Sequence, residues 1–227
     1  MKYLLPILLT VGCAVIDHWF LLEMDRKHHA KAAGWKTLAS LCFLLVGLWF
    51  AFCLPPSGGR RTLVFLGLLL GLIGDALLAL RFVFPEKFDL LFVSGAASFA
   101  AGHALYLLYL LGGDGGAWLA GLPFWIAGLA LSALYAFRKK TDAGPLQLPG
   151  CGYMALVVAM GAVACGAAVR RPGAGQMLFA LGGILFGVSD NLLVAHCFGT
   201  AKAMVYNRWV HYTYYAAQLL IAWSLAF

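Results

Sequence analysis

The feature that most constrains this chain is a series of long apolar runs, separated only by short polar connections. Each run approaches the ~20 residues that an α-helix needs to cross the hydrocarbon core of a bilayer. Lipid offers no partner to an exposed backbone N–H or C=O group, so these runs must fold as helices. We predict eight spans, at residues 3–22, 35–54, 62–82, 89–111, 117–137, 149–169, 174–197 and 205–226.

The composition leaves no room for a separate soluble domain. Of the 227 residues, 63% are hydrophobic and 11% are charged, whereas a soluble domain carries about 25% charged residues. We therefore expect an all-α, polytopic membrane bundle that forms a single integral membrane domain over residues 1–227. The first apolar run is too long for a signal peptide and is expected to remain as the first span.

The basic residues predict the orientation. The side that holds the N-terminus and the even-numbered loops carries five Lys and Arg residues, and the other side carries eleven. The positive-inside rule places the richer side in the cytoplasm and both termini outside it. The net charge of +7 is then a topology signal, and nucleic-acid binding is not expected. Short loops and a short N-terminal segment favour a bacterial plasma membrane over the endoplasmic reticulum.

Two aspartates, Asp75 and Asp190, stand inside predicted spans, where a charged residue costs about 2.5–3.5 kcal/mol. Each lies seven residues before the predicted cytoplasmic end of its span (82 − 75 and 197 − 190). Glycines precede them at helical spacing: Gly67 and Gly71, and Gly183 and Gly187. Faces of small residues pack against neighbouring helices, so both carboxyl groups should point into the bundle.

The two aspartates also admit a purely structural role, as hydrogen-bonding groups between helices. Asparagine would provide much of that bonding at lower cost, so two aspartates at matched depth favour function. The segments Gly-Leu-Ile-Gly-Asp75 and Phe-Gly-Val-Ser-Asp190 lie 115 residues and four spans apart. This spacing suggests two parallel four-helix repeats, a pattern of membrane proteins that bind ligands between repeats.

Further polar side chains are candidates for the lining of a cavity. The last span carries a stripe at i, i+4, i+7 and i+11, made of Asn207, His211, Tyr214 and Gln218. Such a stripe is unusual on a helix that should otherwise be apolar. His103 and Tyr106 lie on the fourth span, and Lys36 stands at the predicted cytoplasmic start of the second.

Several chemical signals are absent from the sequence. No two histidines are four residues apart, no G-x-S-x-G elbow occurs, and the six cysteines form no C-x-x-C pair. We therefore predict neither a metal nor a cofactor. Asp17 and His18, on the first span, could line the site from the same cytoplasmic half, but the favoured interpretation is an interfacial pair that reaches towards the headgroups.

Four short motifs carry a family resemblance: Gly74-Asp75-Ala-Leu-Leu, Gly102-His103-Ala-Leu-Tyr106, Val188-Ser189-Asp190, and Thr213-Tyr214-Tyr215-Ala-Ala-Gln218. From Lys36 to its C-terminus the chain resembles the YhhN-type lysoplasmalogenases. The resemblance implies eight spans and hydrolysis of the vinyl-ether bond of lysoplasmalogens, with Asp75 and Asp190 as the catalytic aspartates. One departure is Thr37, which follows Lys36 where the family usually has proline.

The implied reaction suits two carboxyl groups. A vinyl ether is cleaved by protonation at the β-carbon, which gives an oxocarbenium ion that water then attacks. The products are a fatty aldehyde and glycerophosphoethanolamine or glycerophosphocholine. Two carboxyls in one dry pocket provide both an acid and an ionised group, as in glycosidases.

The expected partners are a lysophospholipid that enters from the membrane and the bilayer itself, and no protein partner is inferred. The predicted substrate-binding residues are Lys36, His103, Tyr106, Asn207, His211, Tyr214 and Gln218. Lys36 is a candidate for holding the phosphate, with Arg81 and Arg208 as further candidates.

Other functions stay open at the level of the sequence. Paired aspartates, a parallel repeat and a polar stripe suit a proton-coupled transporter or a lipid-binding membrane protein equally well. A related lipid hydrolase that acts on an epoxide, an ester or an alkyl ether would also use an acid and a carboxylate.

Overall fold

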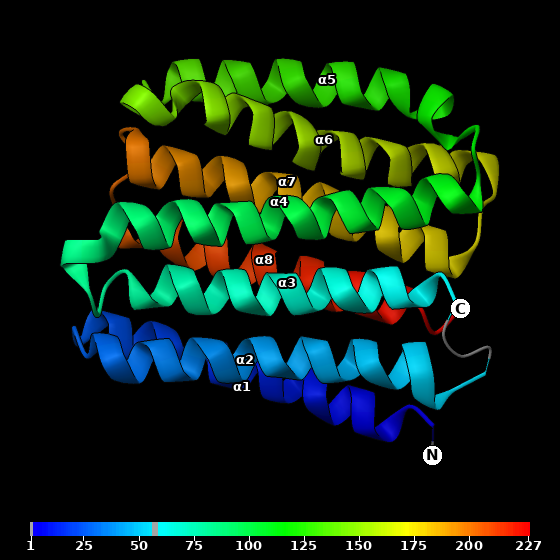
Figure 1. Ribbon diagram of the computed structural model, residues 1–227, viewed down its shortest axis with the longest axis horizontal. Helices are drawn as coiled ribbons and strands as arrows, with labels where there is room; N and C mark the ends of the chain where they lie inside the picture. Colours follow the sequence, from blue (N-terminus) through cyan, green and yellow to red (C-terminus); the bar gives the residue numbers. More distant parts are fainter. Residues whose placement is uncertain (1, 56–58) are drawn as a thin grey trace. The chain divides into compact units, whose positions relative to one another are not determined.

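The computed structural model describes residues 2–55 and 59–227, and Figure 1 shows its ribbon. In the described residues every regular element is a helix and no strand occurs, so the all-α prediction is confirmed. The long helices are α1 (Leu4–Asp25), α2 (His29–Leu48), α3 (Arg61–Leu80), α4 (Phe88–Gly113), α5 (Ala117–Arg138), α6 (Gln147–Arg170), α7 (Ala174–Phe198) and α8 (Met204–Ser224). A π-helical turn, Trp49–Cys53, extends α2.

The helix boundaries follow from local chemistry. Pro85 opens a single 3₁₀ turn, Pro85–Lys87, immediately before α4, because proline suits a first turn whose N–H groups have no partner. Before α6, Gly144 adopts a positive φ of 53°, and its N–H donates to the Asp142 carboxylate at 2.9 Å. Such a left-handed position favours glycine, and the chain reverses there.

Seven of these helices are long and apolar enough to cross a membrane, namely α1 to α7 with their short flanking turns. The chain is therefore an integral multi-pass membrane protein. The remaining helix, α8, has 21 residues but does not meet the same criterion of apolarity, because it carries the polar stripe. The prediction of eight spans is thus supported for seven helices, and the crossing by α8 stays a prediction.

The chain divides into two compact units, with the boundary between Tyr106 and Leu107 inside α4. The first unit holds α1, α2, α3 and most of α4, and the second holds the end of α4 with α5 to α8. The single membrane domain inferred from composition stays a prediction.

In the first unit the helices pack in chain order. α1 packs on α2 and α2 packs on α3, and Figure 1 shows these neighbours as adjacent ribbons. The contact between α3 and α4 depends on glycine: a Cβ added to Gly74 would lie 2.7 Å from the Phe99 ring. The glycine face of α3 therefore packs against α4, and the neighbouring Asp75 is directed towards α2.

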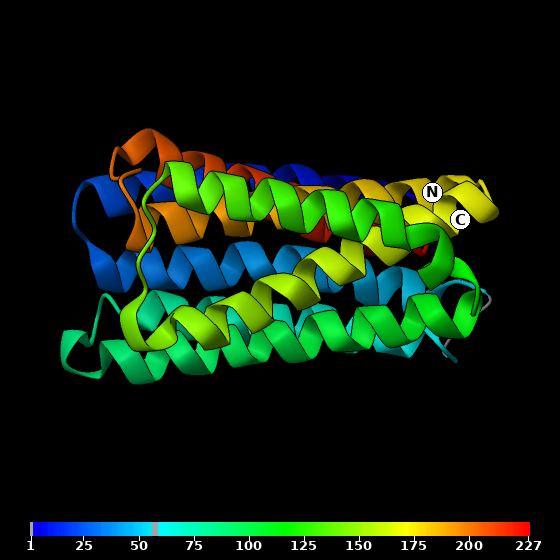
Figure 2. The same ribbon diagram turned by 90° about the horizontal axis from the view of Figure 1, so that it is seen from above.

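The second unit repeats this order, with α5 on α6, α6 on α7 and α7 on α8. Figure 2 shows α6 running obliquely to α5. α6 and α7 also approach closely, since a Cβ on Gly183 would lie 2.8 Å from the Gly161 Cα. Gly187, one turn further along α7, has open space where its Cβ would be. The predicted small-residue packing face thus holds at Gly183 and not at Gly187.

Replacement of Gly183 by alanine is expected to destabilise the protein by about 1–3 kcal/mol, because its methyl group would meet backbone atoms that must move apart. The matched control is Gly187→Ala on the same helix, where a methyl group fits and the better helix propensity of alanine is expected to stabilise slightly. Thermal unfolding of both variants in detergent checks the difference. Equal melting temperatures for the two would contradict the close packing of α6 and α7.

The turn between α4 and α5 is fixed by an ion pair. The Asp114 carboxylate accepts from Arg170 Nε at 2.8 Å and from the Gly116 N–H at 3.0 Å. The Arg170 guanidinium, followed by the backbone N–H, holds the pKa of Asp114 below its usual value. The turn therefore keeps its charge pairing at neutral pH and ties α5 to the end of α6.

Candidate functional site

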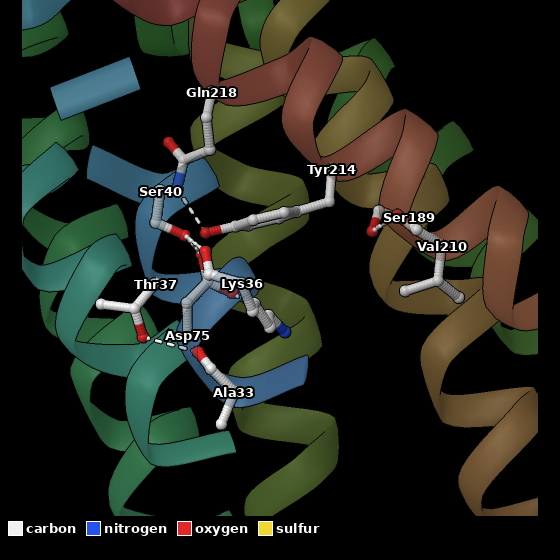
Figure 3. A network of polar contacts seen from close by, with 9 residues as sticks. All are labelled: Ala33, Lys36, Thr37, Ser40, Asp75, Ser189, Val210, Tyr214 and Gln218. Atoms are coloured by element: carbon white, nitrogen blue, oxygen red, sulfur yellow. Dashed lines mark hydrogen bonds and ion pairs between the residues drawn. The ribbon is translucent and has the colours of Figure 1, made fainter. Parts of the chain in front are cut away.

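The first unit buries a charged pair between α2 and α3. Lys36 Nζ lies 3.1 Å from Asp75 Oδ1, and the two side chains are 10% and 1% exposed. Ser40 Oγ lies 2.5 Å from Asp75 Oδ2. Figure 3 shows the Ser40 hydroxyl directed at the Asp75 carboxyl group, with Lys36 beside it. A buried carboxylate that has a cation and a hydroxyl donor on its two oxygens is stable in the ionised form.

The spacing along α2 explains this arrangement. Lys36 and Ser40 are four residues apart, so their side chains lie on one face of the helix. Ser40 Oγ also lies 3.0 Å from the Lys36 carbonyl, the backbone acceptor one turn earlier on the same helix. The neighbouring residue Thr37 bonds instead to the Ala33 carbonyl at 3.0 Å, as Figure 3 also shows.

On α4, His103 and Tyr106 are both buried, each with 1% of its surface exposed. His103 Nδ1 lies 2.7 Å from the Phe99 carbonyl, which must accept, so the neutral ring carries its proton on Nδ1. The Tyr106 ring stands edge-on to His103 at 6.1 Å and lies against Gly67 of α3. Both predicted residues therefore belong to the interior of the first unit.

The second unit buries the other aspartate. Asp190 on α7 is 5% exposed, and Tyr153 on α6 donates its hydroxyl to Asp190 Oδ2 at 2.7 Å. Among the described residues of this unit, the ion pairs join Arg170 and Arg171 to Asp114 and involve no cation at Asp190. The prediction that both aspartates point into the protein is confirmed by their burial.

The polar stripe of α8 is largely interior. His211, Tyr214 and Gln218 are 7%, 6% and 1% exposed, whereas Asn207 is only half-buried. Gln218 Nε2 donates to the Tyr214 hydroxyl at 3.1 Å, a bond that Figure 3 shows. The Tyr214 ring stands edge-on to Phe186 of α7 at 5.4 Å, so the stripe faces the helix that carries Asp190.

The two units share a pattern that sequence reasoning missed. In each, the partner of the aspartate comes from the preceding helix: Lys36 lies 39 residues before Asp75 (75 − 36), and Tyr153 lies 37 before Asp190 (190 − 153). This correspondence is what a duplicated four-helix unit predicts, although the repeat itself stays a prediction. The same spacing counted back from Asp190 leads to residue 151 (190 − 39), two residues before Tyr153, so it could have directed the search to this part of α6.

The observed helix bounds change the depths expected for Lys36, Asp75 and Asp190 within their helices. The second helix begins at His29, so Lys36 lies seven residues inside it (36 − 29), roughly 10 Å from its start, and its place at the membrane boundary stays a prediction. Asp75 and Asp190 lie five and eight residues before the ends of α3 and α7 (80 − 75 and 198 − 190), not seven each. Helix ends read from hydropathy shift by one or two residues because last turns fray.

Asp17 is the other correction. It is 2% exposed and interacts electrostatically with Lys36 and Asp75, so it is not a headgroup-facing residue. His18 is exposed, as predicted. These two neighbours can differ in exposure because consecutive residues point about 100° apart on a helix.

The candidate phosphate ligands Arg81 and Arg208 differ in their settings. Arg81 is 7% exposed, and its guanidinium lies 4.7 Å from the Phe82 ring and 5.2 Å from the Phe92 ring. Cation–π contacts of this kind favour a desolvated guanidinium. Arg208 is exposed on α8. The phosphate-binding roles of Lys36, Arg81 and Arg208 stay predictions.

Comparison with known proteins gives one family. The model of the YhhN family matches residues 31–225. Neither a curated protein nor a solved structure matches the chain. In the part of the chain that the structure describes, no group of three His, Cys, Asp or Glu residues has the geometry of a metal site.

Proposed function

Because the chain belongs to the YhhN family, we propose that it is a lysoplasmalogenase. It hydrolyses the vinyl-ether bond of lysoplasmenylethanolamine or lysoplasmenylcholine, giving a fatty aldehyde and the glycerophospho-headgroup. The observation that carries the proposal, beside the family, is a pair of buried aspartates with unlike partners: Asp75 with a cation and Asp190 with a neutral hydroxyl. Acid cleavage of a vinyl ether needs a proton donor, and a second carboxyl in the ionised state can stabilise the oxocarbenium ion that forms.

The unlike partners assign the two roles. Lys36 compensates the charge of Asp75, so Asp75 is the ionised member. Asp190 is buried beside a neutral phenol, where an isolated charge is costly, so it is the member that carries a proton. That the two carboxyls share one chamber is part of the proposal.

The proton balance closes with these two groups alone. Asp190 donates its proton to the β-carbon, and Asp75 stabilises the oxocarbenium ion. Water adds to this ion and gives a proton to Asp75, which leaves a hemiacetal. Asp75 then protonates the ether oxygen while Asp190 takes the proton of the hemiacetal hydroxyl, and the C–O bond breaks. Aldehyde and alcohol leave, and both carboxyls return to their starting states.

The substrate enters from the bilayer with its phosphate at the cytoplasmic interface, in a bacterial plasma membrane with both chain termini outside the cytoplasm. The polar faces of α4 and α8 line its path: His103, Tyr106, Asn207, His211, Tyr214 and Gln218. The alternative is a proton-coupled transporter or a lipid-binding membrane protein, which the buried Lys36–Asp75 pair and the like order of helices in both units would also suit.

The deciding experiment is aldehyde release from lysoplasmenylethanolamine by the full chain purified in detergent, where no gradient exists. Multiple turnovers are expected, together with stoichiometric glycerophosphoethanolamine. Ester, alkyl-ether and epoxide lysolipids form the comparison panel. Binding of the lysolipid without turnover would favour the lipid-binding alternative and refute the proposal.

Tyr153 gives a prediction that arises from this assignment. Tyr153→Phe removes the donor to Asp190 and is expected to lower kcat about tenfold, since the carboxyl loses the hydrogen bond that orients it. The stability cost should be about 1 kcal/mol. Tyr212→Phe, on an exposed tyrosine of α8, is the matched control. Unchanged kcat in a folded Tyr153→Phe protein would remove Tyr153 from the site.

A further inference from the structure

A second buried carboxyl group of the first unit, that of Asp17, lies beside the Lys36–Asp75 pair. It belongs to α1, a helix that the family model does not cover. Asp17 on α1 lies outside residues 31–225 and is 2% exposed. The proposed mechanism leaves it without a task. A buried aspartate in a span is costly and needs an explanation.

The packing of α1 on α2 places Asp17 opposite Lys36. Cys13 Sγ lies 3.3 Å from the Ala39 carbonyl, which fixes the register of the two helices. They run in opposite directions, so one turn along α1 from Cys13 leads to Asp17, and the same step back along α2 leads to Lys36. The Lys36 ammonium also lies 5.9 Å from the ring of Phe20, on the same face of α1.

The charges of Asp17, Asp75 and Lys36 do not balance if all three of these groups are ionised. Asp17 and Asp75 would carry two negative charges against the single positive charge of Lys36. The Cys13 thiol interacts electrostatically with both carboxyl groups and with the Cys42 thiol. An uncompensated buried charge is costly, and a single proton on one carboxyl removes it. Asp75 has the direct ion pair, so the proton belongs to Asp17.

We propose that Asp17 is a positioning residue of the reaction, which sets how much of the Lys36 charge is committed to Asp75. With Asp17 protonated, Lys36 pairs with Asp75 alone, and Asp75 is a weak base. When Asp17 ionises, it shares Lys36, and Asp75 becomes a stronger base towards the attacking water. Asp17 thereby links the pH of the medium to the rate, and this inference rests on the proposed function.

The kinetic test compares the pH profiles of kcat/KM for the wild type and Asp17→Asn. Asparagine keeps the shape of a protonated carboxyl, so the variant should fold and should lose one ionisation from the profile. Its maximal kcat/KM should fall about tenfold, equal to one pKa unit in the basicity of Asp75. Asp25→Asn, on the exposed end of α1, should keep the wild-type profile, and Asp17→Glu should restore the ionisation. A profile of Asp17→Asn that superimposes on the wild type refutes the role.

A spectroscopic test does not depend on turnover. In infrared difference spectra at pH 5, wild type minus Asp17→Asn is expected to show the C=O stretch of a protonated carboxyl, with the usual shift in D₂O. Asp25→Asn should leave that band in place. If the band belongs to Asp17 but no aldehyde is released, the charge cluster stands and the proposed function fails. If aldehyde is released but the band is missing from the difference, the function stands and the inference fails.

Discussion

Asp190→Asn is expected to lower kcat for aldehyde release by two to four orders of magnitude, because the variant lacks the proton that starts the reaction. General-acid catalysis contributes an acceleration of about that size. KM should change little, since asparagine preserves the shape of the side chain and can still accept from Tyr153. The measurement is single-turnover and steady-state aldehyde release by the purified protein.

Asp75→Asn is expected to cause a comparable loss through the other role, the stabilisation of positive charge and the activation of water. Asp89→Asn, on the exposed first turn of α4, is the control and should keep full activity. Asp89→Asn should turn over like the wild type. If Asp75→Asn or Asp190→Asn does so as well, the aspartate replaced in that variant takes no part in the chemistry.

Lys36→Met is expected to destabilise the protein by about 3–5 kcal/mol, because it leaves the Asp75 carboxylate buried without its cation. Both side chains are at least nine-tenths buried, so bulk water is a poor replacement for the ammonium. The matched control is Lys31→Met, an exposed lysine on the same helix, which should shift the melting temperature little. Thermal unfolding in detergent measures both.

A double variant separates the loss of the pair from the loss of one partner. Lys36→Met with Asp75→Leu removes both charges and fills the space with apolar side chains, a change that is often neutral or stabilising for a buried pair. We expect it to regain most of the stability of the wild type and none of the activity. A double variant as unstable as Lys36→Met alone would show that the ion pair is not the source of the effect.

The sequence predicted the helices and the burial of the two aspartates because hydropathy and helical spacing are local properties. Their immediate partners were harder to find. Ser40 and Tyr153 are ordinary residues of apolar spans, and only the packing of α2 on α3 and of α6 on α7 shows that they contact a carboxyl group.

The burial of Asp17 could not be predicted from the sequence. Its neighbour His18 is exposed, and a short Asp-His pair in a first span reads as an interfacial feature. Which of two adjacent residues faces the next helix depends on the rotation of α1. That rotation is set by the contact of Cys13 with α2, which no pattern in the sequence encodes.

The Lys36–Asp75 pair also bears on how the chain enters the bilayer during synthesis. The lysine and the aspartate belong to consecutive helices, so they can meet before the second half of the protein leaves the ribosome. A helical hairpin of α2 and α3 that leaves the translocon together is electrically neutral at this point, whereas either helix alone would bring a bare charge into lipid. Because the two helices are consecutive in the chain, Lys36 and Asp75 can enter the lipid together as one electrically neutral segment.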